Sequence, residues 1–383
     1  MKRIKKRIKR LIKKLIIYFF NIPIFKINNQ KVIFDNFAGN RFGDSPKYIT
    51  LELLKQHLDA DIVWVLRDLD EELPSPIRKV RFGSLRSYYE FATSKVIVDN
   101  IRNSKLYKKK FNQFCIQTWH APLGMKQVEK KVEKFLDEDY IKDAKMDGIY
   151  TDLMVANNDV YYELFKNDFW YKGQVLKIGL PRCDMFFEDT SPYKKKVYEY
   201  YNIDPNNRIV FYCPTFRKNI EPETFVFDFY KMISVLNTKY NQNFVMLVRL
   251  HPNMVNMNLN IHYDSRIINA NSYSDVQEII AASDVCVTDY SSIMFEFGMQ
   301  NKPVFLLCKD FQNYISTERN LEFDIKELPF CLSTTESELL NMINSFDLDE
   351  YNNRVNSFFD KIGLVRSNKS SYEIYKIIKE QLT

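Results

Sequence analysis

The chain has 383 residues, of which 45% are hydrophobic and 15% aromatic, and its formal net charge is +6. This length suits two domains of roughly 150 to 190 residues better than one core. The positive charge is concentrated at one end: residues 1–14 hold nine Lys and Arg and no acid, which leaves 46 basic against 49 acidic residues elsewhere. A body with this balance is not a general nucleic-acid binder.

The N-terminal segment, residues 1–27, is expected to form a basic amphipathic helix on a membrane surface. Ile4, Ile8, Leu11 and Leu15 recur at helical spacing, with Lys and Arg on the other faces. Polybasic segments gain about 1 kcal/mol per basic residue near an anionic leaflet. The apolar run 15–20 is far shorter than the roughly 20 residues that span a bilayer, and no signal-peptide cleavage site follows it. The alternative is a solvated arm or one that binds nucleic acid.

Short β-branched runs alternate with helical patterns after this segment, which predicts an α/β fold with parallel sheets covered on both faces. The expected strands are 31–36, 62–66, 95–100, 114–120, 153–157 and 175–180, then 208–213, 244–250, 266–269, 285–289 and 303–308. They predict two Rossmann-like, doubly wound domains that face each other, residues 28–190 and 191–383, divided at EDTSPY (188–193). The final helices, including 370–382, are candidates to pack back across the domain interface.

The six cysteines, at positions 115, 183, 213, 286, 308 and 331, are scattered, and most lie in apolar, strand-like runs. No pair has CxxC spacing, so neither a zinc site nor a disulfide framework is indicated. We expect reduced core thiols, which place the folded body in the cytoplasm.

Polar residues end several of the expected strands, where doubly wound domains bind their ligands. His120 ends one strand, Arg249 and His251 end another, and Arg217 follows a third. A neutral His is a competent base for a hydroxyl group, and a second His with Arg and Ser donors suits a diphosphate leaving group. The alternative for each His is a purely structural role.

The segment VCVTDYSSIMFEFG (285–298) predicts a strand, two serines and a helix. A helix N-terminus offers unpaired N–H groups, so this junction is a candidate phosphate cradle. The alternative is that Ser291 or Ser292 is an ordinary N-cap. The chain lacks GxGxxG after its first strand, GxxxxGK[ST], HExxH and DxD. These absences disfavour a dinucleotide oxidoreductase or a P-loop NTPase, and no metal is implied.

Six motifs, taken in their order along the chain, resemble those of a known family. They are QTWHAPLGMK (117–126), KIGLPRCDMFF (177–187), FYCPTFRKN (211–219), LVRLHPN (247–253), ASDVCVTDYSSIMFEF (282–297) and KPVFLL (302–307). This set resembles the CDP-glycerol glycerophosphotransferase family, which makes teichoic-acid-type polymers. The resemblance implies a glycosyltransferase-B-like architecture with the active site in the cleft between two domains. The segment 35–46 also resembles the opening loop of capsule-associated members.

The resemblance implies roles for individual residues. His120 corresponds to the catalytic base of the family's WHG motif, and His251 corresponds to the RLHP histidine near the donor diphosphate. The implied CDP- and phosphate-binding residues are Arg217, Arg249, Thr288, Asp289, Ser291, Ser292 and Glu296. Arg182 is either a further diphosphate partner or a structural residue. The implied acceptor-side residues are Gly39, Asp44 and Trp119. Two positions depart from the family: Ala121 replaces a glycine, which disfavours a positive φ there, and Glu296 replaces the commoner aspartate.

The resulting prediction is a peripheral phosphotransferase on the cytoplasmic face of the membrane. It moves glycerol phosphate, or a related polyol phosphate, from a CDP-activated donor to a hydroxyl of a lipid-linked saccharide or growing polymer and releases CMP. We expect no cofactor and no nucleic acid; the expected partners are an anionic membrane and an undecaprenyl-linked acceptor, and homo-oligomerisation is left open. The donor carries glycerol, ribitol or another polyol, and the activity is that of a primase or of a polymerase; the sequence leaves these alternatives open.

Three alternatives remain: a glycosyltransferase that uses a UDP- or GDP-sugar, a nucleotide-sugar epimerase, and a non-catalytic membrane scaffold. A further choice concerns four lysines in the expected acceptor-side loop. They meet a phosphate-bearing acceptor or form a solvated helix face, and the second is favoured. The four are Lys126, Lys130, Lys131 and Lys134.

Overall fold

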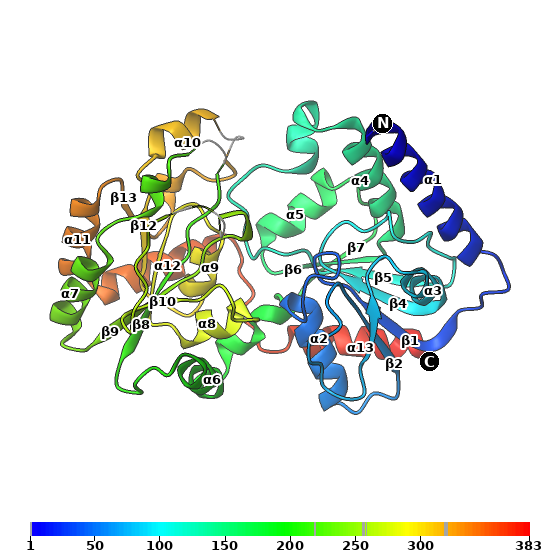
Figure 1. The fold of residues 1–383 in the computed structure, drawn as a ribbon, viewed down its shortest axis with the longest axis horizontal. Coiled ribbons are helices and arrows are strands. Elements are labelled where there is room, and N and C mark those ends of the chain that lie inside the picture. Colours follow the sequence, from blue (N-terminus) through cyan, green and yellow to red (C-terminus); the bar gives the residue numbers. More distant parts are fainter. Residues whose placement is uncertain (1, 218–219, 255–256, 258, 318–320) are drawn as a thin grey trace. The chain divides into compact units, whose positions relative to one another are not determined.

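A computed structural model describes residues 2–217, 220–254, 257, 259–317 and 321–383. The chain forms two compact units (Figure 1). Unit 1 contains residues 1–120, 128–184 and 367–383, and unit 2 contains residues 121–127 and 185–366.

Unit 1 is built on a parallel sheet of seven described strands in the order β3-β2-β1-β4-β5-β6-β7. The strands are β1 Asn28–Phe34, β2 Asp61–Leu66, β3 Arg78–Arg81, β4 Ser94–Asp99, β5 Phe114–Gln117, β6 Leu153–Ala156 and β7 Gln174–Lys177. The helices are α1 Lys2–Phe20, α2 Asp44–Lys55, α3 Leu85–Thr93, α4 Glu138–Tyr150, α5 Asp159–Asp168 and α13 Ser370–Leu382, with a 3₁₀ segment η1 Glu129–Phe135. The strand order reverses between β1 and β4, which is the ligand-binding position of Rossmann-type sheets.

The sheet of unit 1 has a separate hydrophobic core on each face, because successive side chains of a strand point to opposite sides. Val32 and Phe34 of β1 pack with Trp64 of β2 and with the apolar side of α13. Ile33, between them, packs in the other core with Phe91 of α3. Both faces are therefore covered by helices, and the predicted α/β fold with parallel sheets is confirmed.

Unit 2 has a parallel sheet of six described strands in the order β10-β9-β8-β11-β12-β13. The strands are β8 Arg208–Tyr212, β9 Phe244–Val248, β10 Ile267–Asn269, β11 Val285–Thr288, β12 Val304–Leu307 and β13 Cys331–Ser333. The helices are α6 Ser191–Tyr201, α7 Phe229–Tyr240, α8 Val276–Ala282, α9 Ile293–Gly298, α10 Phe311–Thr317, α11 Glu336–Asn344 and α12 Leu348–Lys361. Short 3₁₀ segments are η3 Pro222–Phe225, η4 Pro252–Met254 and η5 Ile325–Glu327, and η2 Pro181–Phe187 joins the two units in sequence. The order of this sheet reverses between β8 and β11.

Two edge strands, β3 and β13, were not predicted from the sequence. β3 has the sequence RKVR, in which only Val80 is buried, and charged edge strands lack the apolar signature of central ones. β13 is three residues long, and only Ser333 is buried. Several expected strands also end too late. β5 ends at Gln117 rather than at His120, so His120 lies in the loop that follows the strand.

The division between the units differs from the expected one at the C-terminal end. Residues 367–383 were counted with the second domain, and helix 370–382 was also named as a candidate to pack back toward the first; in the structure α13 packs in unit 1 against α2, β1 and β4. Its buried side chains join the core around Trp64, which is why it belongs there. Asp184 fixes its first turn, because the carboxylate accepts hydrogen bonds from the backbone N–H of Ser370 (3.1 Å) and Ser371 (2.7 Å). Residues 121–127, which were expected in the first domain, fall in unit 2.

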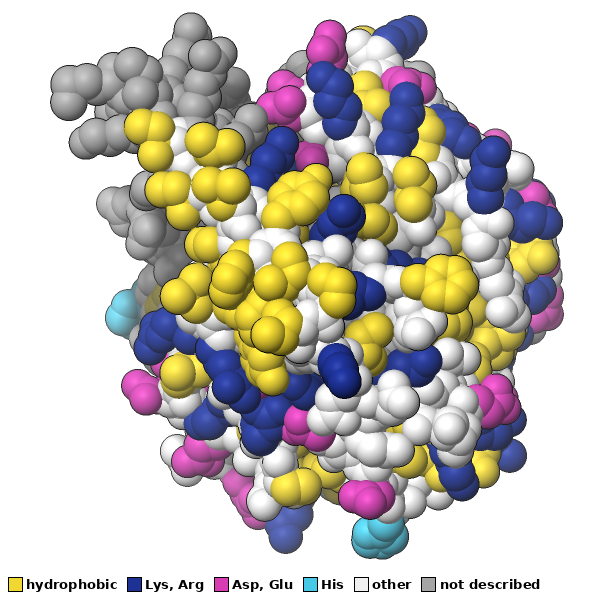
Figure 2. Space-filling view, turned by 90° about the vertical axis from the view of Figure 1, so that its right-hand side faces the viewer, with side chains coloured by type: hydrophobic (Ala, Val, Ile, Leu, Met, Phe, Trp, Pro, Cys, Tyr) yellow, Lys and Arg dark blue, Asp and Glu magenta, His cyan; other side chains and the backbone are white. Residues whose placement is uncertain are grey.

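Helix α1 leaves large apolar side chains exposed along one side. They are Ile8, Leu11, Ile12, Leu15, Tyr18 and Phe19. The helix is held to unit 1 through α3, where the Phe20 ring lies 6.1 Å from the Tyr89 ring. Figure 2, which faces this side of unit 1, shows hydrophobic side chains gathered on the surface with Lys and Arg side chains beside them. No helix in the described part of the chain is both long enough and apolar enough to cross a membrane.

The packing of α13 generates a test of unit 1. Ile378 is fully buried in the same core as Trp64, so Ile378→Ala is expected to lower the free energy of unfolding of unit 1 by about 2–5 kcal/mol. Urea unfolding followed by tryptophan fluorescence measures this unit alone, because Trp64, Trp119 and Trp170 all lie in unit 1. Glu380→Ala, an exposed position of the same helix, is the control. Equal midpoints for the two variants would contradict this packing.

Candidate functional site

A loop with an unusual backbone follows the central strand of unit 1. Phe37, Ala38 and Gly39 all have positive φ, at 45°, 56° and 77°. The Asp35 carboxylate accepts a hydrogen bond from the Gly39 N–H (2.6 Å), which closes the turn. A Cβ on Gly39 would lie 2.8 Å from Cβ of Phe82, so the position requires glycine. The role of Gly39 in this structure is therefore to shape the loop.

Asn100, which follows β4, connects this loop to His120. Its side-chain amide donates to Oδ1 of Asn36 (2.7 Å), and its own Oδ1 accepts from the Phe37 N–H (2.9 Å). Its backbone carbonyl lies 2.9 Å from Nδ1 of His120. Since β1 and β4 are the two strands at which the sheet order reverses, this contact lies beside the ligand-binding position of the fold.

The contact with Asn100 determines which nitrogen of His120 carries the proton. A carbonyl oxygen only accepts hydrogen bonds, so Nδ1 of the neutral ring must be the donor, and Nε2 keeps its lone pair. Burial lowers the pKa of His120, although the hydrogen bond to Asn100 partly opposes this shift. The ring is flanked by those of Phe37 and Trp119, with centroids 5.3 and 4.3 Å away. His120 is thus a neutral imidazole at pH 7 with Nε2 as its basic atom.

Arg182 and Asp44 hold the backbone of His120. The two side chains are buried and form an ion pair at 2.7 Å, and the same Nη1 of Arg182 donates to the carbonyl of His120 (3.1 Å). The structure therefore brings together four of the predicted site residues, Asp44, Trp119, His120 and Arg182. In this arrangement the guanidinium group of Arg182 is paired with the Asp44 carboxylate. The left-handed residue of this segment is Trp119 (φ 55°) and not Ala121, so the replacement of glycine by Ala121 carries no backbone strain.

Sequence reasoning missed the buried polar cluster beneath this loop. The side-chain amide of Asn103 donates to the carboxylates of both Asp35 and Asp99. Burial raises the pKa of Asp35 to about 6. Burial and the neighbouring Asp35 carboxylate raise the pKa of Asp99 well above its ordinary value. Asp35 directly follows β1, and Asp99 is the last residue of β4. Their place at the ends of two strands was the signal in the sequence from which this cluster could have been found.

In unit 2 the corresponding reversal of strand order brings the PTFR and TDYSS motifs together. The Thr215 N–H donates to Oδ1 of Asp289 (2.9 Å), and the Thr288 hydroxyl donates to the carbonyl of Cys213 (2.6 Å). These contacts join the end of β8 to the end of β11. Lys218 and Asn219, the last residues of the first motif, lie outside the described residues.

Arg217 lies buried beneath this junction and is bound by two carboxylates. Its Nη1 pairs with Asp289 at 2.6 Å, and its Nε pairs with Asp310 at 2.7 Å. Its guanidinium carbon also lies 5.0 Å from the centroid of the Tyr290 ring. A phosphate bound to Arg217 would therefore have to displace a carboxylate, and the observed contacts fit a residue that holds the junction in place.

His251 has the opposite tautomer to His120. Its Nδ1 accepts a hydrogen bond from the Asn253 N–H (3.2 Å), so in the neutral ring Nε2 carries the proton and is a donor. Its side chain is exposed and stacks on Phe216, with centroids 5.6 Å apart, and partial desolvation lowers its pKa. Nearby in sequence, Arg249 donates through Nη1 to the carbonyls of Ala270 (3.0 Å) and Tyr273 (2.8 Å).

The expected strand–Ser-Ser–helix junction is present as β11, residues 289–292 and α9. Ser291 and Ser292 are half-buried, and the Ser292 side chain makes no capping hydrogen bond. The N–H groups of Met294 and Phe295 are bonded to the carbonyls of these two serines. On the following turn Glu296 is buried and accepts a hydrogen bond from Gln277 (3.2 Å).

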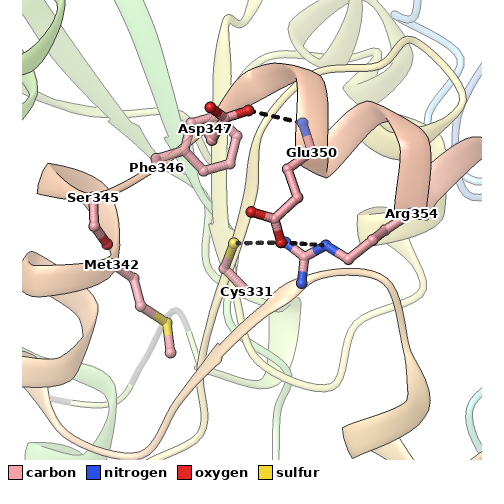
Figure 3. A pocket seen from close by; sticks show the side chains of 7 residues that line it. All are labelled: Cys331, Met342, Ser345, Phe346, Asp347, Glu350 and Arg354. Atoms are coloured by element: carbon pink, nitrogen blue, oxygen red, sulfur yellow. Dashed lines mark hydrogen bonds and ion pairs between the residues drawn. The ribbon is translucent and has the colours of Figure 1, made fainter.

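A small pocket elsewhere in unit 2 involves none of these residues (Figure 3). It is lined by Cys331, Met342, Ser345, Phe346, Asp347, Glu350 and Arg354. As Figure 3 shows, its polar groups satisfy one another: Asp347 caps α12 through the Glu350 N–H (2.8 Å), and the Arg354 side chain reaches Glu350 and the sulfur of Cys331. We assign it no part in the chemistry.

Comparisons with known proteins agree on one family. The family model described as CDP-Glycerol:Poly(glycerophosphate) glycerophosphotransferase matches residues 16–380. A teichoic acid poly(glycerol phosphate) polymerase of Staphylococcus epidermidis is 26% identical over 372 residues, which are 93% of this chain and 52% of that protein. The chain thus spans about half the length of that relative. A polymerase of the same description from Bacillus spizizenii is 24% identical over 379 residues, covering 96% of this chain and 95% of the relative.

A primase and a solved structure are also similar to the chain. The teichoic acid glycerol-phosphate primase of Bacillus subtilis is 29% identical over 287 residues, 72% of this chain and 73% of that protein. The structure of the wall teichoic acid polymerase TagF superposes with a TM-score of 0.84 at 23% identity, covering 100% of this chain and 97% of that chain. At this identity the structural likeness establishes the fold.

The environment of His120 gives a direct expectation for its titration. Its pKa should lie below the ordinary value of about 6.5, so the ring gains a proton only when the pH falls below that value. Phe37→Ala removes a ring that shields the imidazole from water and should raise the pKa toward the ordinary value. NMR titration of the His120 ring measures both values. Phe135→Ala, an exposed aromatic position of unit 1, should leave the pKa unchanged, and an equal shift in both variants would contradict the shielding.

Proposed function

The chain belongs to the CDP-glycerol:poly(glycerophosphate) glycerophosphotransferase family, and we propose that it transfers glycerol phosphate, or a related polyol phosphate, from a CDP-activated donor to a hydroxyl group. The acceptor is a lipid-linked saccharide or a growing polymer, and CMP is released. The observation that carries the proposal is the state of His120, a neutral imidazole whose Nδ1 is committed to the Asn100 carbonyl and whose Nε2 is a base. Acceptor activation requires such a base.

In the proposed reaction Nε2 of His120 takes the proton of the acceptor hydroxyl while the hydroxyl oxygen attacks the β-phosphorus of the donor. A new phosphorus–oxygen bond forms, and the bond from the β-phosphorus to the bridging oxygen breaks. CMP leaves with that electron pair. Arg182 and Asp44 act through the backbone of His120, because their ion pair holds its carbonyl.

We assign the donor to unit 2 and the base to unit 1, as in a glycosyltransferase-B-like enzyme. Nε2–H of His251 donates a hydrogen bond to the leaving phosphate, and the hydroxyls of Ser291 and Ser292 provide further donors. Arg249 contributes positive charge, and Thr288, Asp289 and Glu296 shape the nucleotide side of the junction. The reaction as proposed uses the CDP-polyol itself and no additional cofactor. The negative charge of the donor is balanced by Arg249 and by the hydrogen-bond donors of His251, Ser291 and Ser292.

We further propose that the protein works at the cytoplasmic face of the cell membrane, on an undecaprenyl-linked acceptor and without a nucleic-acid partner. The support is the combination of nine basic residues within residues 1–14 and the exposed apolar side of α1. A helix of this kind lies in the interface, with its apolar side among the acyl chains and its basic residues near anionic head groups.

The test of the reaction is CMP release from CDP-glycerol or CDP-ribitol with a lipid-linked disaccharide as acceptor. His120→Ala should lower kcat by about 10²- to 10⁴-fold, the usual contribution of a general base. His262→Ala removes an exposed histidine and serves as the control. No CMP from the wild type with either donor would overturn the reaction, whereas near-normal turnover by His120→Ala would overturn the role of the base alone. The mass of the product identifies the donor and separates the addition of one unit from that of many.

The test of membrane binding is sedimentation with vesicles that contain phosphatidylglycerol. Leu11→Ser combined with Leu15→Ser should weaken binding by about tenfold or more, because each leucine loses apolar area that enters the interface. Leu348→Ser, at an exposed leucine of unit 2, is the matched control. Unchanged binding of the double variant would show that α1 does not carry the attachment. High salt should weaken the binding of every variant, since screening acts on the basic residues.

A further inference from the structure

The segment that follows His120 belongs to a different unit from His120 itself. Residues 121–127 pack within unit 2, whereas His120 is the last residue of the preceding segment of unit 1. We call residues 121–127 the strap. Its end is held by β-type pairing, because Lys126 forms an antiparallel bridge with Leu321, and the carbonyl of Met125 accepts from the Glu322 N–H (2.8 Å). One peptide bond thus separates the proposed base from a segment that is anchored on unit 2.

The strap also contacts an aromatic pair at the TDYSS motif. The ammonium group of Lys126 lies 5.4 Å from the centroid of the Tyr314 ring. The Tyr314 ring is buried and stacks on that of Tyr290, with centroids 3.4 Å apart and planes at 2°. Lys126, Tyr314 and Tyr290 therefore form a continuous series of cation–π and stacking contacts.

Tyr290 is fixed on its other side by the buried ion-pair network. Its hydroxyl donates to Asp310 (3.1 Å), and its backbone N–H donates to Asp289 (2.6 Å). Arg217 binds both of these carboxylates. A buried network of this kind resists displacement, because moving one member leaves another charge without its partner. Because the Tyr290 ring is held in place, the Tyr314 ring that stacks on it and the Lys126 ammonium group beside that ring are held in place as well.

We propose that Lys126 and Tyr314 are positioning residues that tie the strap, and through it the backbone of His120, to the donor-binding junction. This inference rests on the proposed function. Neither residue is assigned to the nucleotide, so their effect is on turnover rather than on donor affinity. Displacements of about 1 Å at a reacting group cost roughly a hundredfold in rate, so a loosened strap has a measurable effect.

The experiment compares lysines that differ in these contacts. Lys126→Met should lower kcat for CMP release about tenfold or more while the KM for the CDP-polyol and the Kd for CDP stay within about twofold. Lys126→Arg keeps the charge over the ring and should restore most of the turnover. Lys130→Met is the control, because Lys130 is exposed and donates only to the carbonyl of Asn167 among the contacts observed for it (2.7 Å). Tyr314→Phe keeps the stacked ring and should remain close to the wild type, unlike Tyr314→Leu.

Hydrogen exchange of the ligand-free protein separates this inference from the proposed function. In Lys126→Met the amides of residues 123–127 and 321–322 should exchange faster than in the wild type, and in Lys130→Met they should not. Wild-type kcat in Lys126→Met, or a loss that appears in KM alone, overturns the positioning role. Unchanged exchange overturns the anchoring. If the wild type releases no CMP from any CDP-polyol, the proposed function fails, and the exchange data still decide whether the strap is held as described.

Discussion

The hydrogen bond between Nδ1 of His120 and the carbonyl of Asn100 is the interaction on which the proposed chemistry depends. Without it, either nitrogen of a neutral imidazole can carry the proton; with it, Nε2 is the basic atom. The surroundings fix both partners of this bond. The Asn100 side chain is held by the loop that follows β1, and the His120 carbonyl is held by Arg182. Much of the polar structure at this edge of the sheet therefore serves to orient one ring.

Unit 2 has the same sheet topology as unit 1, but its candidate histidine carries the proton on the other ring nitrogen. Both sheets have the Rossmann order of strands, and in both the polar motifs gather where that order reverses. The imidazole of unit 2 is held through a backbone N–H rather than a carbonyl, which makes its Nε2 a donor. Two histidines that look equivalent in the sequence thus differ in chemical character because of a single backbone partner each. One suits proton removal, and the other suits an anionic oxygen.

The sequence patterns predicted the α/β class and most strands, because apolar strands are local features of the sequence. The patterns did not predict contacts between residues that are far apart in the sequence. Arg217, which the resemblance assigns to CDP and phosphate binding, pairs with Asp310, which is 93 residues away and has no spacing relation to it. Asn100 was missed because its decisive group is a backbone carbonyl, which no residue pattern reveals. β3 was missed because a charged edge strand does not look like a central strand.

The location of α13 in the core of unit 1 has a consequence for biosynthesis. Most of unit 1 precedes unit 2 in the chain, yet it takes its last helix from residues translated after the whole of unit 2. Since domains tend to fold as their chain emerges, unit 2 can complete its core first, while one face of the sheet in unit 1 is still only partly covered, by α2 without α13. Removal of residues 370–382 would accordingly damage the unit whose other segments are synthesised before unit 2 is complete.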